Sequence, residues 1–235
     1  MLRTAGIIAL VAVIGFAVSA TFAACGDDGG GGGNTPGGGT VSKETISAKW
    51  TIRNSANSTF EFTPDSIYVV VGDFGQPASR VYVYTGTYTI SGNKITLEDF
   101  GVLEIKSFSN DEFSFSLKLT DSDESYDYQA IRQDDTIVSS TQTNLLCRFW
   151  KVIKPSDMAG TGVLFSKAGT YLVTYTDGST GLAEWKWKNT EQTTLQYSWD
   201  RWEESDEVQI QELTASSLKI NEMGDTYELV PSGGN

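Results

Sequence analysis

The side chains of this chain that are best suited to recognising a ligand are aromatic, and they gather in its C-terminal half. Trp185 and Trp187 are two residues apart, so in a strand they share one face, where they either pack into a core or line a ligand cavity. Trp202 stands beside the acidic run 203–206. An exposed indole ring beside carboxylates can hold a sugar by stacking and hydrogen bonding. The alternative is a bulge that turns Trp202 inward.

Strand alternation assigns each aromatic residue of the C-terminal half to the interior or to the outside of the fold. It predicts interior positions for Trp185, Trp187, Tyr197 and Trp199, and an outside position for Trp202. We expect the first four mainly to fill a core, with any ligand near Trp202. The candidate ligand-binding residues are Trp185, Trp187, Trp199, Trp202, Tyr82, Tyr84 and Tyr88.

Catalytic and metal-binding chemistry find little support in the composition. The chain has no histidine, which removes the usual general base at neutral pH and the commonest metal ligand. Oxygen ligands for calcium could come from Asp121, Asp123, Glu124 and Asp127, but the spacing of these residues favours a solvated turn. No carboxylate pair is singled out for glycoside hydrolysis. We expect no enzymatic activity, no catalytic residue, no metal site and no cofactor.

The segments that position these residues have the character of strands. From about Glu44 onward, short runs rich in Tyr, Phe, Val, Ile and Thr are bounded by Gly, Asn, Asp or Ser. The clearest run, 113–119, puts Phe, Phe, Leu and Leu on one face and Ser, Ser and Lys on the other. Ser91-Gly92-Asn93 separates two such runs and predicts a hairpin. The sequence therefore predicts an all-β fold.

An internal repeat decides the expected architecture. A tryptophan, an aromatic pair six residues apart, a set of apolar residues with gaps of three, five and two, and a closing strand recur in the same order. In the first copy these are Trp50, Phe62, Tyr68, Ile105, Phe108, Phe113 and Phe115, and in the second Trp150, Phe165, Tyr171, Ile210, Leu213, Leu218 and Ile220. At one strand per 8–12 residues, a copy of about 85 residues gives seven or eight antiparallel strands. We expect two tandem small β-barrels, at 45–135 and 145–231, joined by a polar segment.

The N-terminus has the three parts of an export signal. Arg3 precedes an apolar run over 7–18, and Ala23 and Ala24 stand just before Cys25. The pattern resembles a bacterial lipobox, which implies cleavage after residue 24 and lipid attachment to Cys25. The alternative is an ordinary secretory signal with a chance cysteine. Residues 1–24 are thus the expected signal peptide, and the Gly-rich segment 25–44 a flexible tether.

The residues after Cys25 and the overall charge bear on location. Gly26 directly follows the cysteine, and a residue other than Asp there implies sorting of the lipoprotein to the outer membrane. Asp27-Asp28 resembles the acidic tag that exports Bacteroidetes lipoproteins to the cell surface. Removing residues 1–24 removes Arg3 and no acidic residue, which takes the net charge from −13 to −14. Such a chain repels nucleic acid and anionic headgroups. We expect a lipid-anchored outer-membrane protein, exposed on the cell surface, that meets the membrane through its lipid and binds no nucleic acid.

If Cys25 carries lipid, Cys147 is the remaining cysteine and an internal disulfide is excluded. Cys147 opens an apolar strand and is expected to be buried as a small hydrophobic residue, with an intermolecular disulfide as the alternative.

A family resemblance covers most of the expected mature chain. The pattern of the two copies resembles the small lipocalin-like (calycin-type) domains of Bacteroidetes lipoproteins. The matching stretches are Trp50, Phe60-Glu61-Phe62, Gly86-Thr87-Tyr88 and 105–115, with their counterparts from Trp150. The resemblance implies β-barrels and small apolar ligands, with no established activity. Two readings remain: a non-enzymatic binding module for a small apolar ligand, or a surface protein that captures glycans or mediates adhesion through exposed aromatic residues.

Overall fold

The fold is described from a computed structural model, which describes residues 40–55, 57–74 and 82–233. These residues belong to one compact unit, Thr35–Asn235. The expected signal peptide, Cys25 and most of the expected tether lie outside the described residues. Within the described part of the chain, no helix has the length and apolar character needed to cross a membrane.

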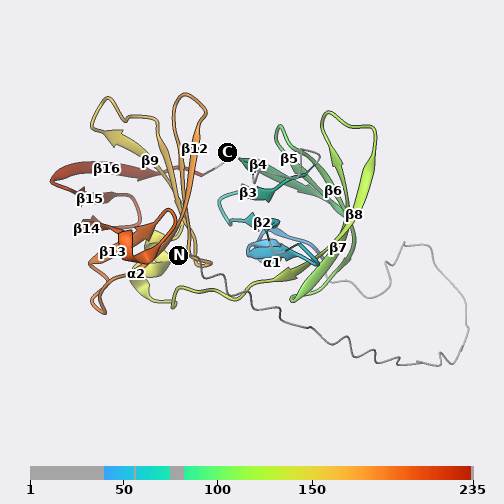
Figure 1. The fold of residues 1–235 in the computed structure, drawn as a ribbon, viewed down its shortest axis with the longest axis horizontal. Helices are drawn as coiled ribbons and strands as arrows, with labels where there is room; N and C mark the ends of the chain where they lie inside the picture. The colour runs from blue at the N-terminus through green and yellow to red at the C-terminus, as the bar shows by residue number, and fades with distance from the viewer. Residues whose placement is uncertain (1–39, 56, 75–81, 234–235) are drawn as a thin grey trace, which may run out of the picture. The chain divides into compact units, whose positions relative to one another are not determined.

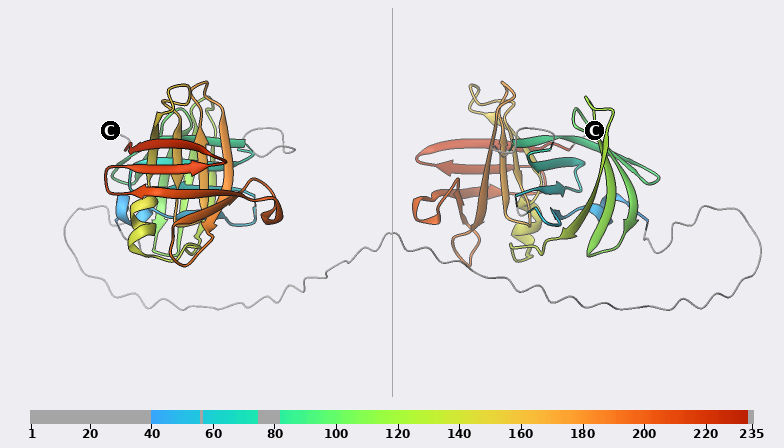
Figure 2. Two further views of the ribbon diagram at one scale, coloured as in Figure 1. Left: turned by 90° about the vertical axis from the view of Figure 1, so that its left-hand side faces the viewer. Right: turned by 45° about the vertical axis from the view of Figure 1, so that its right-hand side comes forward.

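The described residues form two closed antiparallel barrels of eight strands each, which confirms the predicted fold class. Figures 1 and 2 show the first barrel in blue to green and the second in yellow to red. The strands of the first barrel are β1(Lys49–Ile52), β2(Thr59–Phe62), β3(Ile67–Gly72), β4(Tyr82–Ser91), β5(Lys94–Leu97), β6(Gly101–Phe108), β7(Glu112–Leu119) and β8(Ser125–Arg132). Those of the second are β9(Phe149–Lys154), β10(Gly162–Phe165), β11(Thr170–Thr174), β12(Thr180–Trp187), β13(Thr194–Ser198), β14(Asp206–Leu213), β15(Leu218–Glu222) and β16(Asp225–Pro231). Each strand pairs with its sequence neighbours, and the first and last strands of each set close the barrel.

A short helix precedes each barrel: α1(Lys43–Ile46), which begins within the segment assigned to the tether, and α2(Thr141–Leu146). A serine side chain caps the N-terminus of each helix. The indole Nε1 of Trp50 donates a 2.8 Å hydrogen bond to the carbonyl of the last residue of α1, and Trp150 does the same to α2. The recurring tryptophans therefore have the same structural role, which is to fix a helix against a barrel.

The three-residue gap in the repeated apolar set is explained by a β-bulge. Alternation alone would put Ile105 and Phe108 on opposite faces of β6, yet both are buried. The pairing register between β6 and β7 shifts just after Ile105, and the register between β14 and β15 shifts just after Ile210. An extra residue at each bulge returns the strand to its original face. The repeat thus preserves a bulge as well as core positions.

The interior of each barrel is filled by side chains. In the first, Trp50 packs edge-on against Phe113 at 4.9 Å between ring centroids, and Phe115 stacks on Phe113 at 4.8 Å. In the second, the ring of Trp185 packs edge-on against Phe165 at 5.5 Å. All five of these side chains are at most 2 % exposed. Small barrels can be filled completely in this way.

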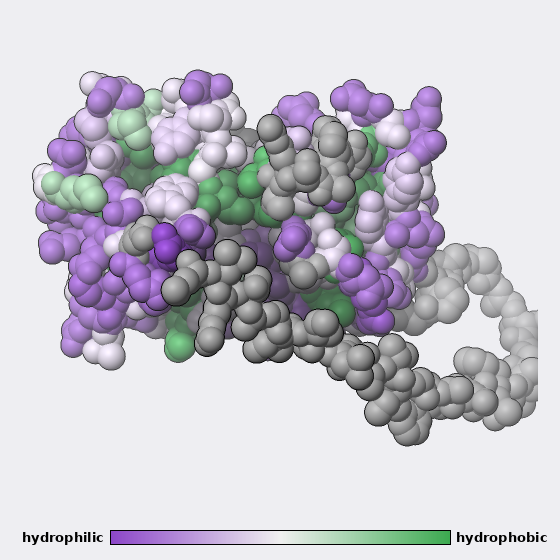
Figure 3. Space-filling model, viewed as in Figure 1, coloured by the Kyte–Doolittle hydropathy of each residue, from purple (hydrophilic) through white to green (hydrophobic). Residues whose placement is uncertain are grey.

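The outer faces of β3, β10 and β11 pack against each other across the two barrels. Val69 of the first barrel forms an apolar cluster with Leu164 and Leu172 of the second, and all three are at most 1 % exposed. The backbone N–H of Phe149 donates a 3.0 Å hydrogen bond to the carboxylate of Asp65. We call this contact the seam. Figure 3 shows green, apolar surface in the recess between the barrels and mostly purple, hydrophilic surface around it.

Candidate functional site

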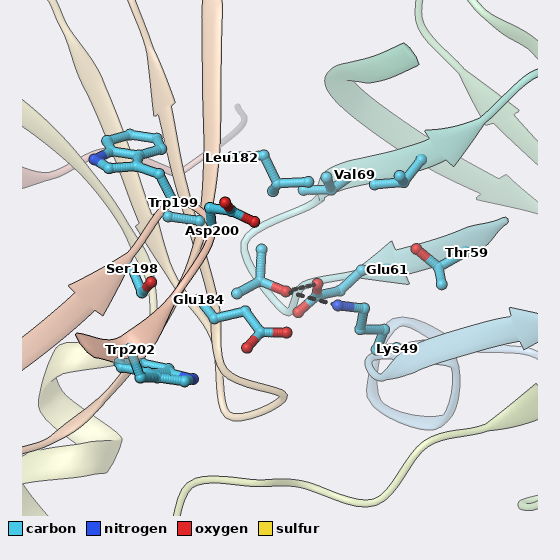
Figure 4. Close-up of a pocket in the computed structure, with 13 residues that line it drawn as sticks. Lys49, Thr59, Glu61, Val69, Leu182, Glu184, Ser198, Trp199, Asp200 and Trp202 are labelled. Atoms are coloured by element: carbon cyan, nitrogen blue, oxygen red, sulfur yellow. Dashed lines mark hydrogen bonds between the residues drawn. The ribbon is translucent and has the colours of Figure 1, made fainter. Parts of the chain in front are cut away.

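A pocket of about 290 Å³ opens along the seam, with walls from both barrels. Its lining comprises Lys49, Thr59, Glu61, Val69, Val71, Thr170, Leu182, Ala183, Glu184, Ser198, Trp199, Asp200 and Trp202. Figure 4 shows Glu184 and Asp200 of the second barrel directed toward the first-barrel residues, with the ring of Trp199 turned away from them. The pocket combines aromatic rings with several hydrogen-bonding groups.

The second barrel contributes a row of three polar residues. Thr170 of β11 pairs with Glu184 of β12, and Glu184 pairs with Ser198 of β13. Directly paired residues share a face of the sheet, so these side chains form a line across three strands. Their neighbours Trp185 and Tyr197 point into the barrel and are buried. Strand alternation therefore directs the polar row outward, into the pocket.

The first barrel contributes an opposing row, since Lys49 pairs with Glu61 across β1 and β2 and Glu61 pairs with Val69 across β2 and β3. The Thr170 hydroxyl donates a 2.6 Å hydrogen bond to Glu61 Oε2, and Lys49 Nζ donates to Thr170 Oγ1 at 3.3 Å (Figure 4). Glu61 is only 3 % exposed. Because a buried carboxylate needs hydrogen-bond donors, this bridge fixes one wall of the pocket.

Trp199 lines the pocket, and 48 % of its area is accessible. Its ring lies on the interior side of the second barrel, as strand alternation predicted, but β13 ends at Ser198 and nearly half of the residue stays accessible. Its ring rests against Tyr171 at 5.9 Å and Tyr197 at 5.6 Å between centroids. A Cβ atom at Gly181 would come within 2.9 Å of the indole, so this glycine makes room for the ring.

Trp202 is the second aromatic residue of the pocket. It begins the short 3-10 helix η1(Trp202–Glu204), is half-buried, and lies on the outer face of the barrel, the side that parity predicted. The ammonium of Lys186 lies 3.9 Å from the centroid of its ring, within the range of a cation–π interaction. The lysine therefore orients the indole while the residue borders the pocket.

Ser198 carries an unsatisfied polar atom. Among the described residues, its Oγ is the one buried side-chain nitrogen or oxygen without a hydrogen-bond partner. A buried hydroxyl left unpaired costs about 1–3 kcal/mol. Ser198 lines the pocket, so a polar group of a ligand, or a water molecule, would satisfy this atom.

The charges of the pocket select among ligands. Glu61, Glu184 and Asp200 are acidic, and Lys49 is the one basic residue of the lining. Such an acidic set disfavours carboxylated, sulfated or phosphorylated ligands through like-charge repulsion. Carboxylates accept hydrogen bonds from hydroxyl groups, so the arrangement suits a polyhydroxylated neutral or amino-bearing ligand.

The other candidate ligand-binding residues lie elsewhere. Trp185 is buried, and its indole Nε1 donates a hydrogen bond to the Ser166 carbonyl at 2.9 Å. Tyr88 is also buried, and its hydroxyl group donates to the Thr63 carbonyl at 2.8 Å. Trp187 is half-buried and donates from Nε1 to Thr143 Oγ1 at 2.9 Å. Tyr82 and Tyr84 lie on β4, outside this pocket. Of the predicted set, the structure brings Trp199 and Trp202 together at the pocket.

Two further sequence-based expectations concern cysteine and metal. Cys147 is partly buried against the core of the second barrel, and burial raises the pKa of its thiol to about 12. Over residues 40–55, 57–74 and 82–233, no three candidate metal ligands gather in one place. Asp127, a member of the acidic run considered for calcium, instead accepts hydrogen bonds from Lys106 and Ser116.

Comparison of the chain with protein-family models and with curated proteins finds no match. The chemical interpretation of the pocket therefore rests on its own side chains.

Proposed function

We propose that this protein is a non-enzymatic binding protein that holds a neutral or amino-bearing saccharide in the pocket at the seam. The observation that carries the proposal is the pairing of two tryptophans with outward-facing carboxylate and hydroxyl groups. The apolar face of a sugar ring would stack on Trp199 or Trp202. Its hydroxyl groups would donate to Glu184 and Asp200, and one would satisfy Ser198 Oγ. Saccharide recognition combines these two kinds of contact.

The alternative, a small apolar ligand inside a barrel, has less support. The interior positions of both barrels hold buried aromatic and aliphatic side chains, among them Phe60, Phe115 and Trp185. A ligand placed there would have to displace a packed core, and interiors of this kind are close-packed. The pocket at the seam is preformed and offers polar contacts that an apolar ligand would leave unsatisfied.

The proposed function is tested by titrating the chain with soluble oligosaccharides and following intrinsic tryptophan fluorescence. We expect a saturable change with neutral or amino-bearing oligosaccharides, because Trp199 and Trp202 both line the pocket. Uronic-acid or sulfated oligosaccharides of equal length serve as the matched control and should bind more weakly. Saturable binding of a fatty acid with no response to any oligosaccharide would instead favour the apolar-ligand alternative.

We also propose that the barrels are lipocalin-like domains of a Bacteroidetes-type lipoprotein, lipid-anchored to the outer membrane through Cys25 and exposed on the cell surface. Closed eight-stranded antiparallel barrels in tandem support the first part. The apolar run that ends in Ala23-Ala24-Cys25, followed by a Gly-rich stretch, supports the anchor. A surface location would place the pocket where extracellular glycans occur.

The anchor is tested by Cys25→Ala. We expect the variant to remain uncleaved or to be released, and to incorporate no labelled palmitate, because the thiol is the acceptor of the lipid. Cys147→Ala, which removes the other cysteine, should label like the unmodified chain. Normal palmitate incorporation into Cys25→Ala would show that the anchor assignment is wrong.

A further inference from the structure

A second pocket, of about 460 Å³, lies where the β2–β3 turn of the first barrel meets the β10–β11 turn of the second. Pro64 belongs to the first turn, and Lys167 and Ala168 to the second. The volume is within the range of small-molecule sites, roughly 300–1,000 Å³. We call it the cationic pocket, for the reason that follows.

Positive charge concentrates around this pocket although the chain carries a net charge of −13. Five basic residues line it: Lys43, Lys49, Arg132, Arg148 and Lys167. Its acidic residues are Glu44, Glu61 and Asp135. Among the described residues, none of the five cations forms an ion pair with a carboxylate. The pocket therefore has an excess of unpaired positive charge.

Two of the cations are held in place by aromatic rings. The guanidinium carbon of Arg132 lies 6.0 Å from the ring centroid of Trp50, and that of Arg148 lies 5.5 Å from Trp150. Arg148 also donates to the Ala215 carbonyl at 3.0 Å. Each guanidinium has five N–H donors, so both retain donors for a ligand. Donors that are already ordered lose less entropy on binding.

The remaining wall of the cationic pocket is apolar. Ala48, Pro64 and Ala168 line it and keep accessible surface. Cys147 also lines it, and since burial raises the pKa of its thiol, the sulfur stays neutral near pH 7. An apolar wall bordered by cations matches a ligand that has an apolar body and an anionic group.

We propose that the cationic pocket binds a small organic anion with a compact apolar body, such as an aromatic carboxylate or sulfonate. The anionic group pairs with Arg132 and Lys167, and the apolar body lies against Pro64 and Ala168. This site is separate from the saccharide pocket and does not depend on the proposed function. The two pockets adjoin, because Lys49 and Glu61 line both.

Calorimetric titration of the full chain with naphthalene-2-sulfonate tests the proposal. Naphthalene-2-sulfonamide has nearly the same shape without the charge, and we expect it to bind roughly tenfold or more weakly, since charged hydrogen bonds are the stronger ones. Arg132→Gln and Lys167→Gln should each weaken sulfonate binding by roughly tenfold and leave sulfonamide binding unchanged. Lys94→Gln, an exposed lysine outside the pocket, is the matched control and should have no effect.

A filling variant keeps the test decisive if a charge variant is unstable. Ala168→Phe places a ring in the pocket and retains every cation, so it should abolish binding of both compounds. The proposal is overturned if sulfonate does not bind saturably up to millimolar concentration, or if sulfonamide binds equally well. It is also overturned if a folded Arg132→Gln or Ala168→Phe protein binds sulfonate as the unmodified chain does.

Discussion

Trp185→Ala is expected to destabilise the protein by about 3–5 kcal/mol, the usual cost of truncating a large core side chain. Trp185 is 2 % exposed, and its ring packs edge-on against Phe165 at 5.5 Å and Trp187 at 5.4 Å. The substitution also leaves the Ser166 carbonyl without the indole donor that it now has at 2.9 Å. Urea unfolding followed by circular dichroism measures the loss as a lower midpoint.

Two variants separate packing from hydrogen bonding in this prediction. Trp185→Phe retains a ring but not the N–H donor, so it should cost less than Trp185→Ala. Trp199→Ala removes an exposed indole from the same barrel and should change the free energy of unfolding by under about 1 kcal/mol. If Trp185→Ala proves no more destabilising than Trp199→Ala, the assignment of Trp185 to the core is wrong.

The barrels were predictable because their determinants are local and occur twice. Alternation over 113–119 correctly placed Phe113, Phe115 and Leu117 in the core. The predicted hairpin is present: Ser91 pairs with Lys94, and Gly92 adopts a φ of 61° in the loop between them. The repeated gaps located equivalent strands and bulges in both halves.

The seam was not predicted, because alternation assumes that one face of each strand meets solvent. Glu61 lies between Phe60 and Phe62 and would be assigned to the surface, yet the second barrel covers it. A signal was nevertheless present. The runs 67–71 and 162–165 are almost continuously apolar, which is typical of strands buried on both faces. Glu61 and Thr170 of the site could have been found only through that seam.

The aromatic part of the site was predictable in residue type and in the face of the barrel, but not in its degree of exposure. Trp199 and Trp202 were identified as candidate binding residues from their type and from the acidic residues nearby. Their exposure depends on where β13 ends, and alternation cannot locate the end of a strand. Glu184 and Ser198 were missed because their cross-strand pairing becomes visible only in the register.

The double variant Trp199→Ala/Trp202→Ala tests the central claim, that these two residues form the recognition surface of a saccharide pocket. Truncating a central aromatic anchor typically costs about 2 kcal/mol or more, which is roughly 30-fold in affinity. We expect each single variant to weaken saccharide binding by about that factor and the double variant to abolish it. Tyr126→Ala removes an aromatic residue that is 50 % exposed on the first barrel, outside the pocket, and serves as the matched control.

The deciding measurement is a calorimetric titration of the double variant and of Tyr126→Ala with the oligosaccharide that gives the strongest fluorescence response. Circular dichroism first establishes that both proteins are folded. The proposed site predicts unchanged affinity for Tyr126→Ala and no measurable binding to the double variant. Equal affinity of the folded double variant and the unmodified chain would contradict it.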